Sequence, residues 1–218
     1  MTQDTIQEQR RSSMVAQIKN YGIKNQPLLK ALMHVPRHLF VPSAQSHLAY
    51  EDTPLPIDCH QTISQPFIVA FMVDAANVHK EDTVLEIGTG SGYNAAVLSL
   101  LAREVYTIEI HAPLQKKAQA LFKSLHYSNI HSKVGDGFFG WREAGPFDVI
   151  IVTAATDSIP ESLLNQLKPR GRLILPFGNA SHQTLIKVTK TDEGFLKEPL
   201  IPVLFVPLTR DIETHIAS

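Results

Sequence analysis

Short apolar runs alternate with longer segments of helical periodicity over most of the chain, from residue 67 to residue 178. Runs such as VLEI (84–87) and VIIV (149–152) have the length of buried strands, and the second is apolar enough for the centre of a parallel sheet. Strands that alternate with helices are joined by right-handed crossovers, so this pattern predicts an open α/β sheet. We expect strands at 82–88, 104–110, 129–135, 147–155 and 171–178, and helices at 67–78, 91–102, 112–125 and 159–167.

The two ends of the chain depart from this alternation. Residues 183–208 alternate around a turn at 192–194, which predicts an antiparallel ending. Residues 4–34 show helical spacing with a break at Tyr21-Gly22. Between Pro36 and Pro66 prolines interrupt the periodicity, and the apolar residues among them favour an ordered loop over a disordered linker. The predicted fold class is α/β: an open, mostly parallel Rossmann-like sheet with helices on both faces, antiparallel C-terminal strands and an N-terminal helical extension.

Composition and charge narrow the possible partners and the cellular location. The 218 residues carry 20 basic and 21 acidic side chains, with no basic stripe, so neither nucleic acid nor a membrane surface is an expected partner. Cys59 is the single cysteine, which excludes an intrachain disulfide. The polar N-terminal stretch lacks the apolar core of a signal peptide, and no apolar run approaches the ~18 residues of a membrane span. We expect a soluble cytoplasmic protein.

Three glycines at alternate positions, Gly88, Gly90 and Gly92, follow the first predicted strand of the sheet. Such a turn either is merely tight or brings backbone N–H groups of the next helix close to a ligand. A dinucleotide turn requires Gly-x-Gly-x-x-Gly, but Tyr93 occupies its last position here. With Glu86 two residues before the turn, Glu-Ile-Gly-Thr-Gly-Ser-Gly resembles the first motif of Rossmann-like methyltransferases, which bind S-adenosylmethionine.

Acidic residues also follow the next two predicted strands. Glu109 ends the second strand, where its carboxylate can accept hydrogen bonds from both hydroxyls of a ribose, in this cofactor or in NAD; alternatively it is a surface acid. Asp136 and Gly137 follow the third strand, where the carboxylate can accept from the exocyclic amine of adenine; alternatively Asp-Gly forms a simple turn. Glycines or acids at three successive strand ends favour the nucleoside cofactor.

A polar segment, QTISQP (61–66), precedes the helix expected at residue 67. Pro66 suits the first turn of a helix, and local sequence favours Ser64 as its N-cap. A hydrolytic Ser–His–acid site is disfavoured because there is no Gly-x-Ser-x-Gly elbow, Ser91 lying inside the glycine turn. His34 and His38 are four residues apart on a possible helix, but no third ligand is evident, so no metal site is expected.

Six motifs in order resemble the protein-L-isoaspartate O-methyltransferase family: QTISQP, VLEIGTGSGYNAAVL, GDG, GPFDVIIVTAA, QLKPRGRLILPFG and FVPL, within residues 14–209. The resemblance implies a repair enzyme that moves a methyl group from S-adenosylmethionine to the free carboxylate of L-isoaspartyl residues in damaged proteins and peptides, leaving S-adenosylhomocysteine. It also implies three parts: N-terminal helices and substrate loop (1–66), a methyltransferase core (67–210) and a tail (211–218). A monomer is expected.

The resemblance also assigns roles to individual residues. The active-site serine of the family falls on Ser64, and Thr209 matches a substrate-side position of some members. The expected substrate contacts are therefore Thr62, Ser64 and Thr209. The expected cofactor contacts are Thr62, Ile63, Ser64, Glu86, Gly88, Gly90, Ser91, Glu109, Asp136 and Gly137.

The chain departs from the family at Asp58-Cys59-His60, where many bacterial members have Gly-x-Gly. Asp and His tolerate positive φ better than most residues, so we expect an active enzyme with a stiffer or slightly displaced loop. Two other functions stay open at this point. One is methylation of a different carboxylate, and the other is a non-catalytic module that binds the cofactor and isoaspartyl groups without turnover.

Overall fold

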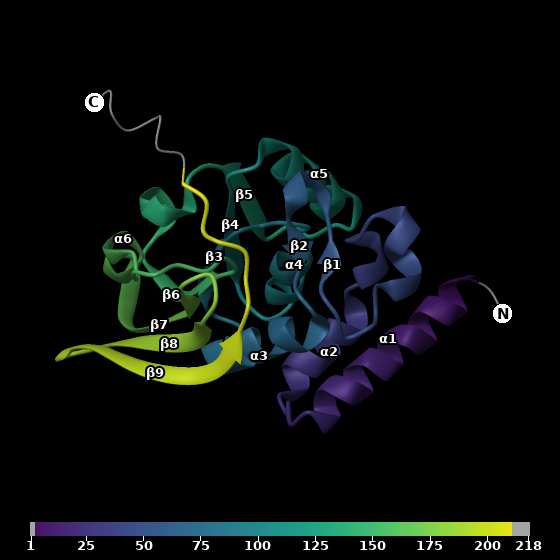
Figure 1. Ribbon diagram of the computed structural model, residues 1–218, viewed down its shortest axis with the longest axis horizontal. Coiled ribbons are helices and arrows are strands. Elements are labelled where there is room, and N and C mark those ends of the chain that lie inside the picture. Colours follow the sequence, from purple (N-terminus) through teal and green to yellow (C-terminus); the bar gives the residue numbers. More distant parts are fainter. Residues whose placement is uncertain (1–2, 211–218) are drawn as a thin grey trace.

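The computed structural model describes residues 3–210, so the predicted tail at 211–218 lies outside the described residues. A seven-stranded sheet in the order β5-β4-β3-β6-β7-β8-β9 forms the centre of the molecule (Figure 1). The first five strands in this order pair in parallel, and β8 and β9 are antiparallel, as predicted. The strands are β3 (Thr83–Ile87), β4 (Glu104–Glu109), β5 (Ile130–Val134), β6 (Phe147–Val152), β7 (Leu167–Gly178), β8 (Gln183–Thr191) and β9 (Gly194–Val203).

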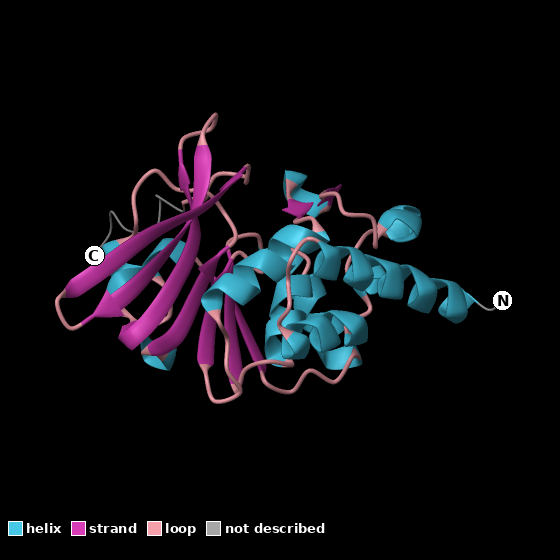
Figure 2. Cartoon of the chain, turned by 90° about the horizontal axis from the view of Figure 1, so that it is seen from below, coloured by secondary structure: helices cyan, strands magenta, loops and turns pink. Residues whose placement is uncertain are grey.

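Helices cover the two faces of the sheet unequally (Figure 2). Side chains of α3 (Pro66–Ala76), α4 (Tyr93–Ser99) and α5 (Ala112–Ser124) belong to one apolar core cluster. The other cluster is covered by α6 (Glu161–Asn165) and by turns of 3-10 helix at Gly137–Phe139 and Arg142–Ala144. The chain moves in one direction from β3 to β4 to β5, so right-handed crossovers put α4 and α5 on the same face.

The reversal of strand order lies between β3 and β6, and it fixes where a ligand can bind. From β3 the chain proceeds outward to β4 and β5, then returns to β6 on the other side of β3. A crevice forms at the carboxyl ends of strands where the order reverses, which is the usual ligand position in open α/β sheets. The one strand predicted short was β7, which begins at Leu167 rather than at residue 171 because Leu167 pairs with Phe147 across an irregular register.

The N-terminal part packs against the helical face of the sheet. Helices α1 (Gln3–Asn20) and α2 (Gln26–His34) are separated at the predicted break. The proline-containing segment is ordered as a series of short 3-10 turns and a two-stranded antiparallel ladder, β1 (Leu55–Pro56) with β2 (Thr62–Ile63). Buried residues from this part join the same cluster as residues of β3, β4 and β6. None of the helices within the described residues has the length and apolarity needed to cross a membrane.

Candidate active site

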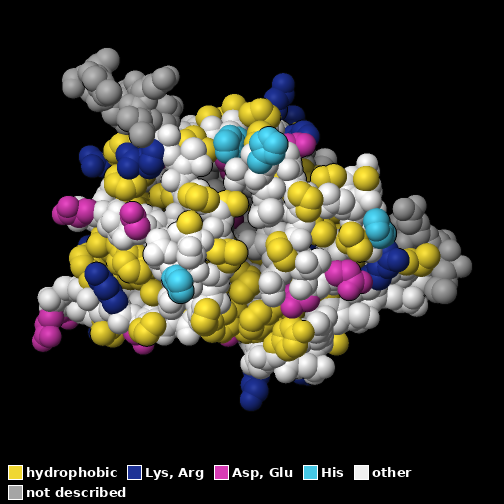
Figure 3. All heavy atoms as spheres, viewed as in Figure 1, with side chains coloured by type: hydrophobic (Ala, Val, Ile, Leu, Met, Phe, Trp, Pro, Cys, Tyr) yellow, Lys and Arg dark blue, Asp and Glu magenta, His cyan; other side chains and the backbone are white. Residues whose placement is uncertain are grey.

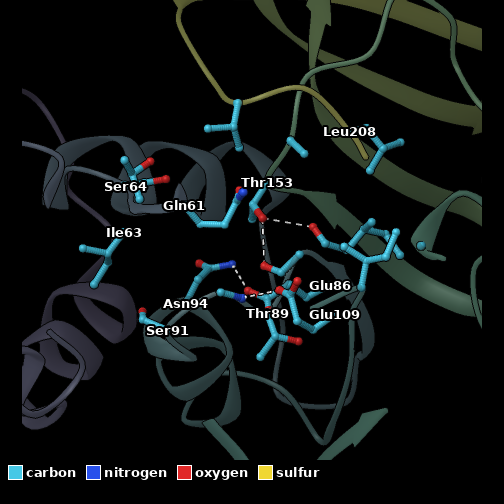
Figure 4. Close-up of a pocket in the computed structure, with 18 of the residues that line it drawn as sticks. Gln61, Ile63, Ser64, Glu86, Thr89, Ser91, Asn94, Glu109, Thr153 and Leu208 are labelled. Carbon is cyan, nitrogen blue, oxygen red and sulfur yellow. Dashed lines mark hydrogen bonds between the residues drawn. The ribbon is translucent and has the colours of Figure 1, made fainter. Parts of the chain in front are cut away.

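One cavity lies at the carboxyl ends of β3, β4 and β6, and β2 and the segment 206–209 also contribute to its lining (Figure 4). It brings together segments that are far apart in the sequence, as expected for the crevice beside a reversal of strand order. Nearly all of the residues predicted to contact cofactor or substrate line it. These are Thr62, Ile63, Ser64, Glu86, Gly88, Gly90, Ser91, Glu109, Gly137 and Thr209.

The glycines of the turn serve different purposes. Gly88 has a φ of +94°, and a Cβ there would overlap Thr153, whose hydroxyl lies 2.8 Å from the Gly88 carbonyl oxygen and 3.0 Å from that of Ile87. Gly92 also has positive φ, but a Cβ there would lie 2.7 Å from the ring of Phe122 on α5. The third glycine therefore permits α4 to pack against α5. Of the three glycines in this turn, Gly88 and Gly90 line the cavity and Gly92 does not.

Glu109 is held by backbone amides at the end of β4. One carboxylate oxygen accepts from Gly90 N at 2.7 Å and the other accepts from His111 N at 3.0 Å. The residue is only 4% exposed, so the alternative interpretation as a surface acid is wrong. Because each carboxylate oxygen can accept a second hydrogen bond, the group can still bind two vicinal hydroxyls in the cavity.

Glu86 is fully buried and belongs to a hydrogen-bond network that the sequence did not indicate. Asn94 Nδ2 donates to one carboxylate oxygen at 2.8 Å, and Thr107 Oγ1 donates to the other at 2.5 Å. Thr107 is in turn 2.6 Å from the hydroxyl of Thr89 in the glycine turn. Burial raises the pKa of Glu86 to about 7, the charge of Glu109 acts in the same direction, and the hydrogen bonds from Thr107 and Asn94 oppose it. A ligand with positive charge would favour ionisation of Glu86.

Asp136 does not line the cavity, although its neighbour Gly137 does. One carboxylate oxygen of Asp136 accepts from Phe138 N, which caps the following 3-10 turn, and the other accepts from Arg210 Nε, both at 2.9 Å. The guanidinium of Arg210 also stacks on the Phe138 ring, 3.6 Å from its centroid. Sequence reasoning missed Arg210, since no local pattern links residue 210 to residue 136.

Ser64 occupies the junction between β2 and α3. Figure 4 shows Ser64 and Ile63 on the opposite side of the cavity from Glu86 and Glu109. The N-cap of α3 is Gln65, and the acceptor for Phe67 N is Asp52 Oδ1, at 2.9 Å. The interpretation of Ser64 as the helix cap is therefore wrong. Its position in the cavity lining agrees instead with a role toward a bound ligand.

The chemical character of the lining limits which ligands fit. Two carboxylates line the cavity together with apolar side chains such as Val69 and Met72, and no lysine or arginine is among its lining residues in the described part of the chain. This environment suits a nucleoside cofactor with positive charge and no phosphate. His34 and His38 do not share a helix, because α2 ends at His34; their Nδ1 atoms contact Lys30 O and Tyr50 Oη respectively.

The fold and the cavity together define a class, that of Rossmann-like α/β proteins with a nucleoside-cofactor site at a glycine turn. The family model described as Protein-L-isoaspartate(D-aspartate) O-methyltransferase matches residues 9–213. The chain therefore belongs to the protein-L-isoaspartate O-methyltransferase family, as its motifs predicted. The matched range includes every residue that lines the cavity.

Individual relatives and solved structures agree with this assignment. A protein-L-isoaspartate O-methyltransferase of Dictyoglomus turgidum is 51% identical over 199 residues, covering 91% of this chain and 90% of the relative. That of Gloeobacter violaceus is 48% identical over 196 residues, covering 89% and 96%. A solved structure of a protein-L-isoaspartate O-methyltransferase gives a TM-score of 0.83 at 30% identity, covering 92% of this chain and 66% of the other. A Plasmodium falciparum structure described by the same activity, in complex with S-adenosyl-L-homocysteine, gives 0.79 at 25% identity, covering 90% and 97%.

Proposed function

We propose that the protein is a repair methyltransferase that transfers a methyl group from S-adenosylmethionine to the free carboxylate of L-isoaspartyl residues in damaged proteins and peptides. The observation that carries this proposal is that one family match, over residues 9–213, includes the whole cavity and the loop with Ser64. The product of the cofactor is S-adenosylhomocysteine, the ligand named for the Plasmodium falciparum structure.

The chemistry needs few groups from the protein. S-adenosylmethionine supplies an electrophilic methyl group on a sulfonium. The acceptor carboxylate, with a pKa near ~4, is already ionised at neutral pH, so no general base is required. The protein must instead exclude water and align the acceptor oxygen, and the apolar lining residues Ile63, Val69 and Met72 suit the first task. Ser64 would orient the acceptor carboxylate or the loop backbone by hydrogen bonding, and it is not a nucleophile.

The remaining roles follow from position around the cavity. Glu109, fixed by the amides of Gly90 and His111, would accept from the ribose hydroxyls. Glu86 lies beside the glycine turn, where a carboxylate is complementary to the ammonium group of the cofactor. Thr62 and Thr209, which also line the cavity, would contact the substrate. Residues 1–66 would thus supply the substrate loop and residues 67–210 the cofactor site.

Asp136 is proposed to accept from the adenine amine, which requires its carboxylate to be shared with, or released by, Arg210. Replacing Asp136 by Ala should weaken cofactor binding by ~1.5–3 kcal/mol, the value of a hydrogen bond to a charged group. Titration calorimetry with S-adenosylhomocysteine measures this change. Arg210→Gln is the matched control, because it removes the ion pair and keeps the carboxylate. Equal affinity in wild type and Asp136→Ala would exclude the adenine role.

A labelling experiment tests the activity itself. Methyl groups from labelled S-adenosylmethionine should enter an L-isoaspartyl peptide as a base-labile ester and should not enter the matching aspartyl peptide. Equal labelling of the two peptides would indicate a methyltransferase for another carboxylate. Absence of labelling in both, with cofactor binding intact, would indicate a non-catalytic binding module.

The expected state of the protein in the cell completes the proposal. We infer a monomer in the cytoplasm whose partners are isoaspartyl proteins and peptides, without nucleic acid or membrane. The nearly balanced charge supports the part of this inference that concerns nucleic acid and membranes, because a protein that binds phosphate groups usually carries an excess of basic residues.

A further inference from the structure

Arg37 is the largest fully buried side chain in the described part of the molecule, and it contacts the loop that carries Ser64. Its Nη2 atom donates to the carbonyl oxygen of Ser64 at 2.8 Å, and Nε donates to that of Ala49 at 2.7 Å. The guanidinium also lies over the ring of Tyr93, 4.6 Å from its centroid. Tyr93 is the first residue of α4, directly after the glycine turn. Arg37 thus contacts both the loop that carries Ser64 and the first residue of α4.

Burying a guanidinium in this place is costly for the fold. Burial lowers the pKa of Arg37 to about 10, with the charge of Asp52 and the tyrosine contacts opposing the shift, so the group is still cationic at neutral pH. Its hydrogen-bond acceptors are the two carbonyl oxygens rather than a carboxylate. An apolar side chain of similar length would fill the space without the desolvation cost. What the guanidinium supplies and an apolar side chain cannot is the pair of hydrogen bonds that fix the Ala49 and Ser64 carbonyls.

Asp52 holds the residues that directly follow Ser64. Its Oδ1 accepts from Phe67 N at 2.9 Å, and its Oδ2 accepts from Gln65 Nε2 at 3.4 Å. The backbone is therefore held at residue 64 by a cation and at residue 67 by an anion, and the same anion also holds the Gln65 side chain. Both charged residues come from the segment between Pro36 and Pro54, which contributes no residue to the cavity lining.

We propose that Arg37 and Asp52 are positioning residues for methyl transfer, which clamp the backbone at Ser64 and at the start of α3 directly after it. The clamp sets where the Ser64 side chain meets the acceptor carboxylate, and neither residue touches the reacting atoms. This inference rests on the proposed function. Because transfer requires alignment of oxygen, methyl carbon and sulfur, a displaced loop lowers the rate more than it lowers cofactor affinity.

The first test compares two arginines that each donate to two backbone carbonyl oxygens. Arg37→Met removes the clamp. Arg172→Met is the control, because Arg172 donates to the carbonyls of Ala76 and Asn77 at the C-terminal end of α3, away from Ser64, and it also pairs with Asp82. We expect both variants to lower the melting temperature. Only Arg37→Met should lower kcat on an isoaspartyl peptide, by up to ~100-fold, with little change in Kd for S-adenosylhomocysteine. Equal kcat in the two variants would overturn the clamp.

A double-mutant cycle separates positioning from general damage. In a Ser64→Ala background, Arg37→Met should lower the melting temperature by the same amount as in wild type. It should lower kcat little further, because the side chain that Arg37 positions is already absent. A full, independent loss of kcat in that background would contradict action through Ser64. Asp52 offers the conservative rescue: Asp52→Asn retains an acceptor for Phe67 N and should keep most of the activity, whereas Asp52→Ala should not.

Hydrogen exchange of the loop amides tests the clamp without a measurement of enzyme activity. Amides of residues 61–68 should exchange faster in Arg37→Met than in wild type, and Arg172→Met should leave them unchanged. Unaltered exchange in that segment would overturn the clamp even if the enzyme proves inactive. Conversely, faster exchange in Arg37→Met, combined with a wild-type protein that has no isoaspartyl activity, would refute the proposed function and leave the clamp in place. If Arg37→Met does not fold, Arg37→Lys and Asp52→Ala carry the same comparisons.

Discussion

Two buried carboxylates face the cavity, and they differ in how the protein stabilises their charge. Glu109 accepts hydrogen bonds from two backbone amides, one on each carboxylate oxygen. Glu86 depends on one amide side chain and one hydroxyl, and it is fully buried. Burial therefore dominates at Glu86 and raises its pKa from the ordinary 4.5 to about 7. We therefore expect Glu86 to make the site sensitive to pH near neutrality.

This difference predicts a pH dependence of cofactor affinity. A cationic ligand beside Glu86 favours its ionised form, so binding should release a proton and become tighter as pH rises from about 6 to about 8. Calorimetry in buffers of different ionisation enthalpy counts the proton. Glu86→Gln should bind more weakly and show no release near pH 7. Wild-type affinity that is flat over this range would contradict the assignment.

The same shift has a consequence for folding stability with a defined sign. Because the folded-state pKa lies above the unfolded one, ionisation of Glu86 disfavours the folded state progressively from about pH 4.5 to about pH 7. Without cofactor, Glu86→Gln should therefore gain stability relative to wild type over this window. Denaturant melts at several pH values measure the difference, and a constant offset between the two proteins would exclude the ionisation of Glu86 as its source.

Ser64 now permits a clean separation of stability from activity. The side-chain acceptor for the first turn of α3 is Asp52 and not Ser64, so Ser64→Ala should leave the melting temperature nearly unchanged and lower turnover strongly. The loss of ~1 kcal/mol that is typical of a missing cap belongs instead to Asp52→Ala. Melting temperature and kcat measured on both variants decide the point. Wild-type kcat in Ser64→Ala would remove Ser64 from the mechanism.

At the scale of elements, the loop before β2 carries unusual backbone conformations. The sequence comparison placed the demanding positions at 58 and 60, but positive φ occurs at Cys59 (57°) and His60 (56°). Asp58 instead places its carboxylate against Lys117 on α5. The expectation for Asp58 was therefore wrong. Two consecutive left-handed residues without glycine are strained, at a cost of order 1–3 kcal/mol each.

Glycine should relieve this strain at the observed positions and nowhere else. Cys59→Gly with His60→Gly should raise the free energy of unfolding by about 1 kcal/mol, after the added entropy of the unfolded chain is subtracted. Asp58→Gly is the contrasting variant, because it removes the ion pair with Lys117 and relieves nothing. Cofactor affinity should not change in any of them. Stabilisation by Asp58→Gly alone would contradict the backbone assignment.

Prediction from sequence was best where a pattern is local. Helix and strand bounds came from periodicity, and the cavity residues came from motifs that lie at strand ends. Hydrogen bonds between residues far apart in the sequence could not be predicted. These are the bonds of Asn94 and Thr107 to Glu86, of Arg210 to Asp136, and of Arg37 to Ser64. Each pair joins residues whose proximity depends on the completed sheet or on the packed loop. The local sequence favoured Ser64 as a cap because a prediction of a helix cap considers only the few residues before the helix. Asp52 lies twelve residues before Ser64 and is outside that segment.

On the scale of the whole molecule, the N-terminal part and the sheet share one core. The cluster that contains Met14 and Leu32 also contains Val84 and Val149, so the boundary near residue 66 does not separate two hydrophobic interiors. We therefore propose that residues 1–66 and 67–210 fold as one cooperative unit, although they contribute differently to function. The face of the molecule in Figure 3 carries charges of both signs interspersed with apolar side chains.

The outer strand of the sheet bears on the oligomeric state. Most of β9 is exposed, but it includes Pro199 and Pro202 and the charged pair Lys197 and Glu198. Prolines and charges on an edge strand disfavour pairing with a second sheet. Light scattering after size exclusion should therefore give a mass near 24.2 kDa. A mass of twice that value, with exchange protection along β9, would show that the edge pairs.

The ion pair between Arg210 and Asp136 bears on how the protein should be handled. It links the last described residue of the chain to the turn that begins at Gly137 in the cavity lining. An affinity tag or reporter fused after Ser218 would begin eight residues beyond this contact. The start of α1 lies on the other side of the molecule (Figure 1). Purification tags, fluorophores and surface-immobilisation handles therefore belong at the N-terminus, where they leave the cofactor site in its native surroundings.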